Sequence, residues 1–464
     1  MDITPATGKT NKTIVLVVSC MAAFIMPFSM TSVNIALPTI GADFSLSAVM
    51  IAWVVTANIL AAGIALVPSG RFADIHGRRK IFIFSSVLMF VAFLTAALAP
   101  NYTVLIIARV LQGIGAGMSN ATYMAILIST YPASDRGKVL GINVASVYIG
   151  ISTAPVIGGF LTQRFGWPSI FYTCAVIALV IFITSIWKIK EEWAEAKGEK
   201  FDLTGTVLLG IGMIATIYGV TLLPTLTGIL IFVAGLAMLG IFVFWESKIK
   251  SPIININLFR HNRVFAFSNI ACLLNYMATF CVSFLLVLYL QYIKGFTPFE
   301  AGLILLVQPV IQTIVAPLAG RLSDKIEPQL VSTTGMVLTT AGLVMFAFLN
   351  DNTTISYVII TQIITGLGFG SFASPNTNAI MSSVDKKYFG VSSAIIGTMR
   401  TMGQLLSQGI ITLLFALFIG HESITPVHYP AFMYSTQIVF IISAVLCLIG
   451  TFTSLYSSNK FAKK

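Results

Sequence analysis

Two arginines lie deep inside apolar stretches of this sequence. Arg109 follows "YTVLIIA", and Arg400 lies in "SSAIIGTMRTMGQLL". A charged side chain in hydrocarbon is costly and usually functional, because its charge must find partners. At ~1.5 Å of rise per residue, Arg400 falls near the middle of its stretch, whereas Arg109 is shallower. Contact with a solute is one interpretation of both. Partial snorkelling is the alternative for Arg109, and bonds to carbonyls of a neighbouring broken helix are the alternative for Arg400.

The carboxylates have the opposite distribution. All 16 aspartates and glutamates fall in loops or at the ends of apolar stretches. Asp43 and Glu300 are expected at outer ends, and Asp202 and Glu246 at inner ends. No buried carboxylate is therefore expected, and a central cavity should be neutral to positive. Anionic, zwitterionic or neutral amphiphiles are favoured over cations, which would lose hydration without meeting a counter-charge. Glu300 and Asp43 are the acids nearest to such a cavity and therefore the nearest candidates to bind a proton, unless a bound solute carries it.

Neutral amides supply most of the remaining polarity inside the apolar stretches. Such side chains suit a wet central cavity, although contact between helices is the alternative for each. Together with the two arginines, the candidates for the cavity are Asn34, Gln112, Asn275, Gln308, Gln312, Gln362 and Gln404. The four histidines lie in loops, and the five cysteines lack metal-ligand spacing. We expect no catalytic residue, no metal and no cofactor, and the sequence indicates a protein other than an enzyme.

Composition indicates the solvent in which these residues are held. Of the 464 residues, 57% are hydrophobic and 9% are charged, and mean hydropathy is +0.92. Soluble domains carry about 25% charged residues. Apolar stretches of ~20 residues recur along the chain, each long enough to cross a bilayer as a helix. We predict an all-α membrane protein with 14 transmembrane helices. The first stretch, 13–36, is interpreted as a retained helix because no small-residue cleavage site follows it.

The net charge of +11 does not indicate nucleic acid, because of where the charges lie. Most lysines and arginines fall in alternate loops, which follows the positive-inside rule. This bias predicts a multi-pass protein of the cell membrane with both termini in the cytoplasm. Contact with anionic membrane lipids is an expected consequence. A small-molecule substrate is the other expected partner, and a monomer is expected.

A charged loop marks an internal repeat. Residues 70–80 read "GRFADIHGRRK", and the Gly70, Arg71 and Asp74 pattern recurs in "GRLSDKIE" at 320–327, where Asp324 corresponds to Asp74 (324 − 74 = 250). "GIGAG" at 113–117 likewise matches "GLGFG" at 366–370. Repeated halves are typical of secondary transporters, whose site lies between the halves. Convergent membrane loops are the alternative.

The repeat divides the chain into three parts. We predict a six-helix bundle at 1–190, two linking helices at 191–250 and a second six-helix bundle at 251–464. The linking helices fall outside the repeat and are expected to contribute no substrate ligand.

These residues resemble the major facilitator superfamily, and most of all its 14-span drug:proton antiporter branch. The loop 70–80 is similar to the family's loop between its second and third helices. "RVLQGIGAG" at 109–117 and "GISTAPVIGG" at 150–159 are similar to motifs of the fourth and fifth helices. Two positions depart from the branch: Ser29 stands where the first helix usually carries an acid, and Ala154 stands where glycine is usual.

The resemblance implies a secondary active exporter of amphipathic small molecules, of the multidrug efflux type, working by alternating access on the proton gradient. It also implies that Asp74 holds the cytoplasmic side closed against the other half. The expected conformational residues are Gly70, Arg71, Asp74, Gly77, Arg78, Pro155, Gly158, Gly159 and Asp324. Two other functions stay open, a carrier of anionic or lipid-like solutes and a membrane sensor that transports nothing. For the loop, the alternative is that its basic residues only set topology.

Overall fold

The computed structural model describes residues 11–199, 201–249, 259, 262–385, 389–420 and 422–457. Within these ranges every regular element is a helix, and 14 helices are long and apolar enough to cross a membrane. The first six are α1 (Lys12–Asp43), α2 (Ala48–His76), α3 (Arg78–Ala97), α4 (Tyr102–Thr130), α5 (Ala133–Phe165) and α6 (Pro168–Lys188). Two more follow, α7 (Leu203–Thr221) and α8 (Leu226–Glu246).

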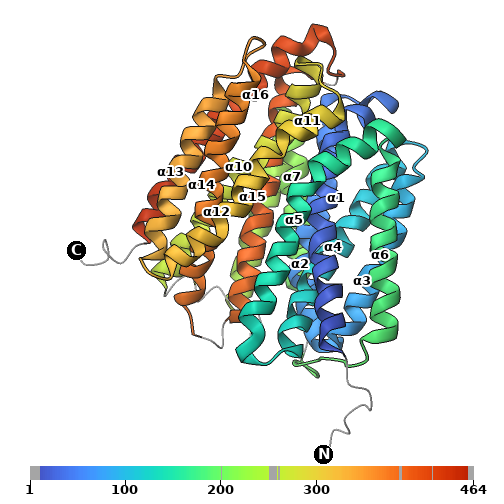
Figure 1. Ribbon diagram of the computed structural model, residues 1–464, viewed down its shortest axis with the longest axis vertical. Helices are drawn as coiled ribbons and strands as arrows, with labels where there is room; N and C mark the ends of the chain where they lie inside the picture. The colour runs from blue at the N-terminus through green and yellow to red at the C-terminus, as the bar shows by residue number, and fades with distance from the viewer. Residues whose placement is uncertain are drawn as a thin grey trace, which may run out of the picture.

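The remaining helices form a second bundle beside the first (Figure 1). They are α10 (Arg263–Leu288), the π-helix η1 (Tyr289–Ile293), α11 (Pro298–Leu305), α12 (Val307–Ser323), α13 (Pro328–Ala347), α14 (Ile355–Ser382), α15 (Phe389–Phe418), the short 3-10 helix η3 (Pro426–His428) and α16 (Tyr429–Tyr456). Because the spans are even in number, both ends of the described chain emerge on one side. That side is called the terminal side below, and the other the opposite side.

Short polar residues set where many of the helices begin. The Ser47 hydroxyl accepts a hydrogen bond from the Met50 N–H at 3.3 Å, and the Asn101 side chain accepts one from the Val104 N–H at 3.0 Å. Each satisfies a backbone donor that has no partner within the helix. Helices can therefore restart after very short connections.

Two predicted boundaries needed correction. The first helix runs to Asp43, well past the predicted 36, because Pro38 continues it without a break. The predicted span 299–319 is divided at Leu306 into α11 and α12, which together make one crossing.

Glycine packing confirms the repeat in three dimensions. A Cβ on Gly113 of α4 would lie 2.2 Å from the Asn58 carbonyl of α2, and a Cβ on Gly366 of α14 would lie 2.9 Å from the Gln308 carbonyl of α12. The middle glycines of the two rows match as well, because Gly115 approaches α3 and Gly368 approaches α13. Small residues allow this close approach of helix backbones in a membrane. The fourth helix of each half therefore packs against its second and third in the same way.

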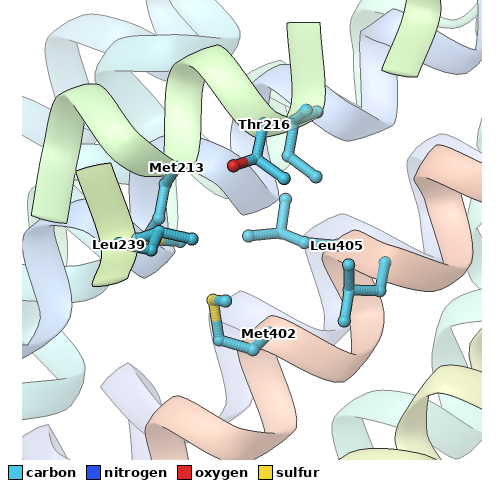
Figure 2. A pocket seen from close by; sticks show the side chains of 7 residues that line it. Met213, Thr216, Leu239, Met402 and Leu405 are labelled. Carbon is cyan, nitrogen blue, oxygen red and sulfur yellow. The ribbon is translucent and has the colours of Figure 1, made fainter. Parts of the chain in front are cut away.

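The helix pair α7–α8 covers one side of the junction between the halves. A Cβ on Gly63 of α2 would lie 3.0 Å from both Met213 Cε of α7 and Thr401 Cγ2 of α15. Figure 2 shows the adjoining apolar cavity, whose lining includes Met213, Leu239 and Met402. Its volume of about 20 Å³ is the space of a single water molecule. This cavity is too small to hold an organic solute.

The described contacts between the two bundles lie from mid-helix to the opposite side. The Gln291 Nε2 donates to the Ile35 carbonyl at 2.8 Å, and the Ala48 N–H donates to the Glu422 carbonyl at 3.1 Å. Further toward the terminal side, α4 leaves the Asn120 side chain exposed. An amide exposed on an otherwise apolar span suits water better than lipid. We infer that the halves meet on the opposite side and are open to water on the terminal side.

Candidate functional site

Arg400 lies midway along α15, among rings and small polar groups. Its guanidinium carbon is 5.6 Å from the centre of the Tyr276 ring on α10, and its NH2 group donates to the Thr377 Oγ1 of α14 at 3.1 Å. The Cys272 thiol also lies within hydrogen-bonding range. A cation over an aromatic face is attracted by the ring quadrupole, and more strongly where water is excluded. The Nε atom is buried and has no partner, so Arg400 keeps a donor for a further group.

The first half contributes two tyrosines to the same region. Tyr148 of α5 and Tyr123 of α4 both interact electrostatically with Arg400. The Tyr148 side chain also lies close enough to Gln312 of α12, in the second half, to be influenced by it. Arg400 and Gln312 were both predicted to line a central cavity, and that role stays a prediction. The Tyr276 ring lies beside the guanidinium of Arg400, and tyrosines of the first half lie within electrostatic range of it.

Arg109 has a different setting, inside the first bundle. It is 1% exposed, and its Nε donates to the Val54 carbonyl of α2 at 2.9 Å. Its NH1 donates to the Gln112 Oε1 at 2.7 Å. In the second half, the Gln362 Nε2 donates to the Ile304 carbonyl at 3.1 Å. The repeat relates both members of these pairs, with 304 − 54 = 250 and 362 − 109 = 253, the same offsets that relate the two loops and the two glycine rows. Arg109 therefore joins α4 to α2 by a side-chain bond to a backbone carbonyl, and this link is called the bracket below. Because the side chain is buried in the bundle, it does not reach the membrane surface, which excludes snorkelling.

The other predicted cavity amides lie partly in the buried core and partly near the contact surface between the two halves, which is called the seam below. Asn34 is 3% exposed and Asn275 is fully buried, and both have amide atoms without a partner. Gln308 and Gln404 are half-buried. The amide contact between the halves at 3.4 Å, from Gln408 Nε2 to the Ala52 carbonyl, was not predicted.

The acids at the opposite side serve as surface anchors. Asp43 is exposed and accepts a bond from the Trp167 Nε1 at 2.6 Å. Glu300 is exposed and forms a capping box with Thr297 at the start of α11. Neither faces Arg400. The expectation that no carboxylate is buried was wrong in one case, because Glu246 at the terminal-side end of α8 is 2% exposed. It lies beside Asp202 across Gly205, at a helix end that the sequence placed at the surface.

The charged loop is paired inside the first half and its linker. Asp74 accepts from the Arg78 Nε at 2.7 Å. Arg78 NH1 donates to the Ser129 Oγ of α4 and to Glu195 Oε1, both at 2.8 Å, and Arg71 pairs with Glu199. The expected contact of Asp74 with the other half is therefore not made in this conformation, because the halves meet on the opposite side.

The fifth-helix residues lie at the seam instead. A Cβ on Gly159 would lie 2.5 Å from the Pro298 carbonyl of α11, and Gly302 of α11 packs against the Pro155 carbonyl. Gly158 faces Ser32 of α1 within the first half. Pro155 and Gly159 therefore lie at the contact between the halves, whereas Gly158 packs within the first half, and small residues permit both close approaches.

In the second half, Gly320 packs against Ser374, and the exposed Asp324 accepts a bond from the Asn378 Nδ2 at 3.3 Å. In the first half, Gly70 lies against Ala121, and Gly77 adopts a φ of +117° directly before α3. Sequence reasoning missed Tyr123 and Tyr148 near Arg400 and the glutamates of the 189–199 segment. The available signal was the group of four glutamates in "IKEEWAEAKGE" at 189–199, which could pair with the basic residues of the loop 70–80.

The fold defines a class of protein, a multi-pass membrane transporter made of two related halves, with the candidate site around Arg400. The chain matches the Major Facilitator Superfamily over residues 19–407 and 268–463 and belongs to it. It is a transporter and not an enzyme.

Among its relatives is the riboflavin transporter RibZ of Clostridioides difficile, 29% identical over 98% of this chain and 99% of that protein. The multidrug resistance protein Stp of Mycobacterium tuberculosis is 27% identical over 85% of this chain and 74% of its own. A crystal structure of a bacterial homolog of the human lysosomal transporter Spinster has the same fold, with a TM-score of 0.71 and 15% identity over 97% of this chain and 98% of that one.

Proposed function

We propose that this protein is a secondary active transporter that exports aromatic amphipathic solutes, neutral or anionic, through a site at Arg400. The observation that carries the proposal is the guanidinium of Arg400 among aromatic rings from both halves, with its Nε left without a partner. The groups that act on Arg400 are tyrosines, a cysteine and a threonine, and among the described residues no carboxylate is one of them.

The chemistry of this region selects for flat rings. A planar solute can stack on a tyrosine ring while its edge accepts a hydrogen bond from the free Nε of Arg400. A cationic solute would be repelled by the guanidinium and would find no counter-charge there. The relative that transports riboflavin supports an aromatic solute, and the multidrug resistance relative supports export of amphipathic compounds.

Alternating access is supported by how the halves meet. The seam on the opposite side consists of backbone contacts and small residues, such as Gly159 against Pro298. Such a surface can separate without leaving a buried charge. We infer that the proton gradient drives transport and that protons accompany the solute, because Asp43 and Glu300 are engaged as surface anchors far from Arg400.

The test uses purified protein in proteoliposomes, with and without an imposed pH gradient. The probes are riboflavin, an aromatic sulfonate dye and a lipophilic monocation. Wild-type protein should transport the first two in preference to the cation, with a rate that depends on the gradient. Arg400→Gln should lower their flux at least about tenfold, the effect of losing one hydrogen bond to a charged group. Glu300→Gln is the matched control and should leave flux intact.

Three results would overturn the proposal. Cation export that is abolished by Glu300→Gln and insensitive to Arg400→Gln would replace it with ordinary cation antiport. Flux of no probe by well-folded protein would favour a membrane sensor. Full activity of Arg400→Gln toward the sulfonate would remove Arg400 from the site. Arg400→Lys, which keeps the charge but not the planar fork, separates electrostatic attraction from directed hydrogen bonding.

A further inference from the structure

The segment 189–199, which joins α6 to the start of the α7–α8 pair, lies across the loop 70–80. Its backbone is joined to the loop at both ends. The Arg78 N–H donates to the Trp193 carbonyl at 2.8 Å, and the Ala196 N–H donates to the Asp74 carbonyl at 3.0 Å. These two bonds place the glutamates of the segment over the basic residues of the loop.

Glu195 forms a bidentate ion pair with Arg78, in which both carboxylate oxygens accept hydrogen bonds. NH1 donates to Oε1 at 2.8 Å and NH2 donates to Oε2 at 3.0 Å. The Arg78 side chain is only 10% exposed, although that of Glu195 is 66% exposed. With Nε bound to Asp74 and NH1 shared with Ser129, every nitrogen of the Arg78 guanidinium is engaged. These contacts use four of the five N–H donors of Arg78, so a second bidentate contact with a carboxylate requires the release of one of the present partners.

Glu192 caps the N-terminus of α3 with its side chain. Its Oε1 accepts from the Arg79 N–H at 2.8 Å, where α3 has no other side-chain cap. Gly77 makes room for it, because a Cβ there would lie 2.5 Å from the Glu192 Cδ. A carboxylate at a helix N-terminus is favoured by the free N–H groups and the helix dipole. Segment and loop are therefore shaped to each other in backbone, charge and volume.

We propose that the segment 189–199 is a latch that stabilises the conformation open on the terminal side, with Glu195 and Glu192 as positioning residues acting through Arg78 and α3. In the opposite conformation the halves must approach each other on the terminal side. Because α2 packs along α15, the loop at the end of α2 then comes to the beginning of α15. A bidentate contact that Arg78 makes there competes with its present partners, of which Glu195 takes two N–H groups.

The strength of the latch suits a switch. An exposed ion pair contributes little to stability and is weakened by salt, so the latch can open without a large barrier. The segment also leads directly into α7, which packs on both α2 and α15. The additional helix pair would thus connect the loop of the first half to the helix of the second half toward which that loop moves.

The test is hydrogen–deuterium exchange of the full-length protein in nanodiscs, without any substrate. Glu195→Gln is compared with Lys197→Gln, a neutralisation of an exposed charge in the same segment. We expect Glu195→Gln to speed exchange about threefold both in the loop and across the membrane at residues 41–48 and 291–300, because breaking an exposed ion pair shifts the population toward the other conformation. Lys197→Gln should leave exchange unchanged in all three regions.

Faster exchange confined to the loop would overturn the proposal, since a merely local bond cannot loosen the opposite side. Glu192→Gln should reproduce the distant effect, and provides a second reading if Glu195→Gln folds poorly. In an Arg78→Gln background, Glu195→Gln should add nothing. An undiminished additional effect there would show that Glu195 acts through another group. Exchange is measured without solute, so the outcome does not depend on whether the proposed transport function is correct.

Discussion

The two halves share their helix packing and differ in their loops on the terminal side. In both, the glycine row of the fourth helix packs against the second and third helices of its own half. In the first half, the loop 70–80 between the second and third helices carries Arg78, whose guanidinium has three side-chain partners. In the second half, proline occupies the related position (328 − 250 = 78) and begins α13 directly. Asp324 there is bonded to the neutral amide of Asn378.

This difference separates the residues that build the fold from those that we expect to control its conformation. What the halves share is what any six-helix unit needs to pack in lipid. Among the described residues, the ion pairs of Arg78 with Asp74 and Glu195 and of Arg71 with Glu199 join the first half to a segment outside both bundles. Charge-assisted, bidentate contacts are directional and can be exchanged, whereas a proline-started helix is fixed. We therefore place the gate in the loop 70–80 and regard the loop 320–327 as an anchor.

The first prediction concerns Arg109 and carries the largest expected effect. Gln362 makes the same bracket with a neutral side chain, so Arg109→Gln should still donate to the Val54 carbonyl. Its cost should be about 1 kcal/mol, that of the lost bond to Gln112. Arg109→Ala removes the bracket and leaves a cavity, and should cost about 3 kcal/mol. Thermal unfolding in detergent measures both.

Equal destabilisation by the two variants would show that the charge, not the bracket, holds α2 against α4. The control is Gln362→Ala, which should behave like Arg109→Ala at lower cost because a smaller side chain is removed. If Arg109→Gln folds normally but loses transport, the charge of Arg109 has a second use. Ser29 and Cys174, which interact with one another beside the guanidinium, are the first residues to test for it.

The second prediction compares related aspartates. Asp74→Asn should lower transport about tenfold, because it replaces a charge-assisted bond to Arg78 by a neutral one. Asp324→Asn should change transport less than about twofold, since an amide can still accept the bond from Asn378. Initial rates in proteoliposomes, normalised to inserted protein, provide the measurement. Similar losses in both variants would mean that the two loops gate symmetrically, against the division drawn above.

Most of the fold was predictable because lipid constrains the sequence strongly. Every span must be a long apolar helix, so hydropathy alone shows the spans, and the offset of 250 residues shows the repeat (324 − 74 = 250). The junction at Leu306 was missed because a one-residue interruption leaves hydropathy unchanged. The longer α1 was missed because Pro38, usually a helix breaker, is accommodated within it.

The site was less predictable, because partners distant in sequence decide each role. Arg109 and Arg400 have similar sequence surroundings, yet one bonds a backbone carbonyl inside a bundle and the other lies against the Tyr276 ring. Helical period alone does not say which face of α4 or α15 meets the other half. The glutamates of 189–199 resembled an ordinary solvated linker, since only the fold brings residues separated by 117 positions together as in Arg78 and Glu195.

The smallest expected effect belongs to the related arginines Arg71 and Arg321. Arg71 pairs with Glu199, whose side chain is 50% exposed, so the pair is strongly screened by water. Arg71→Gln should lower transport by no more than about twofold at low salt, and by less at 0.5 M salt, where the Debye length is only a few ångströms. Arg321 is exposed in the second loop, and Arg321→Gln should have no effect at either salt concentration. A loss with Arg71→Gln as large as that expected for Asp74→Asn at low salt, and much reduced at 0.5 M salt, would show that the loop acts through its summed positive field. In that case individual contacts such as that of Arg78 with Glu195 would not define the gate, and Arg321→Gln should then also impair transport.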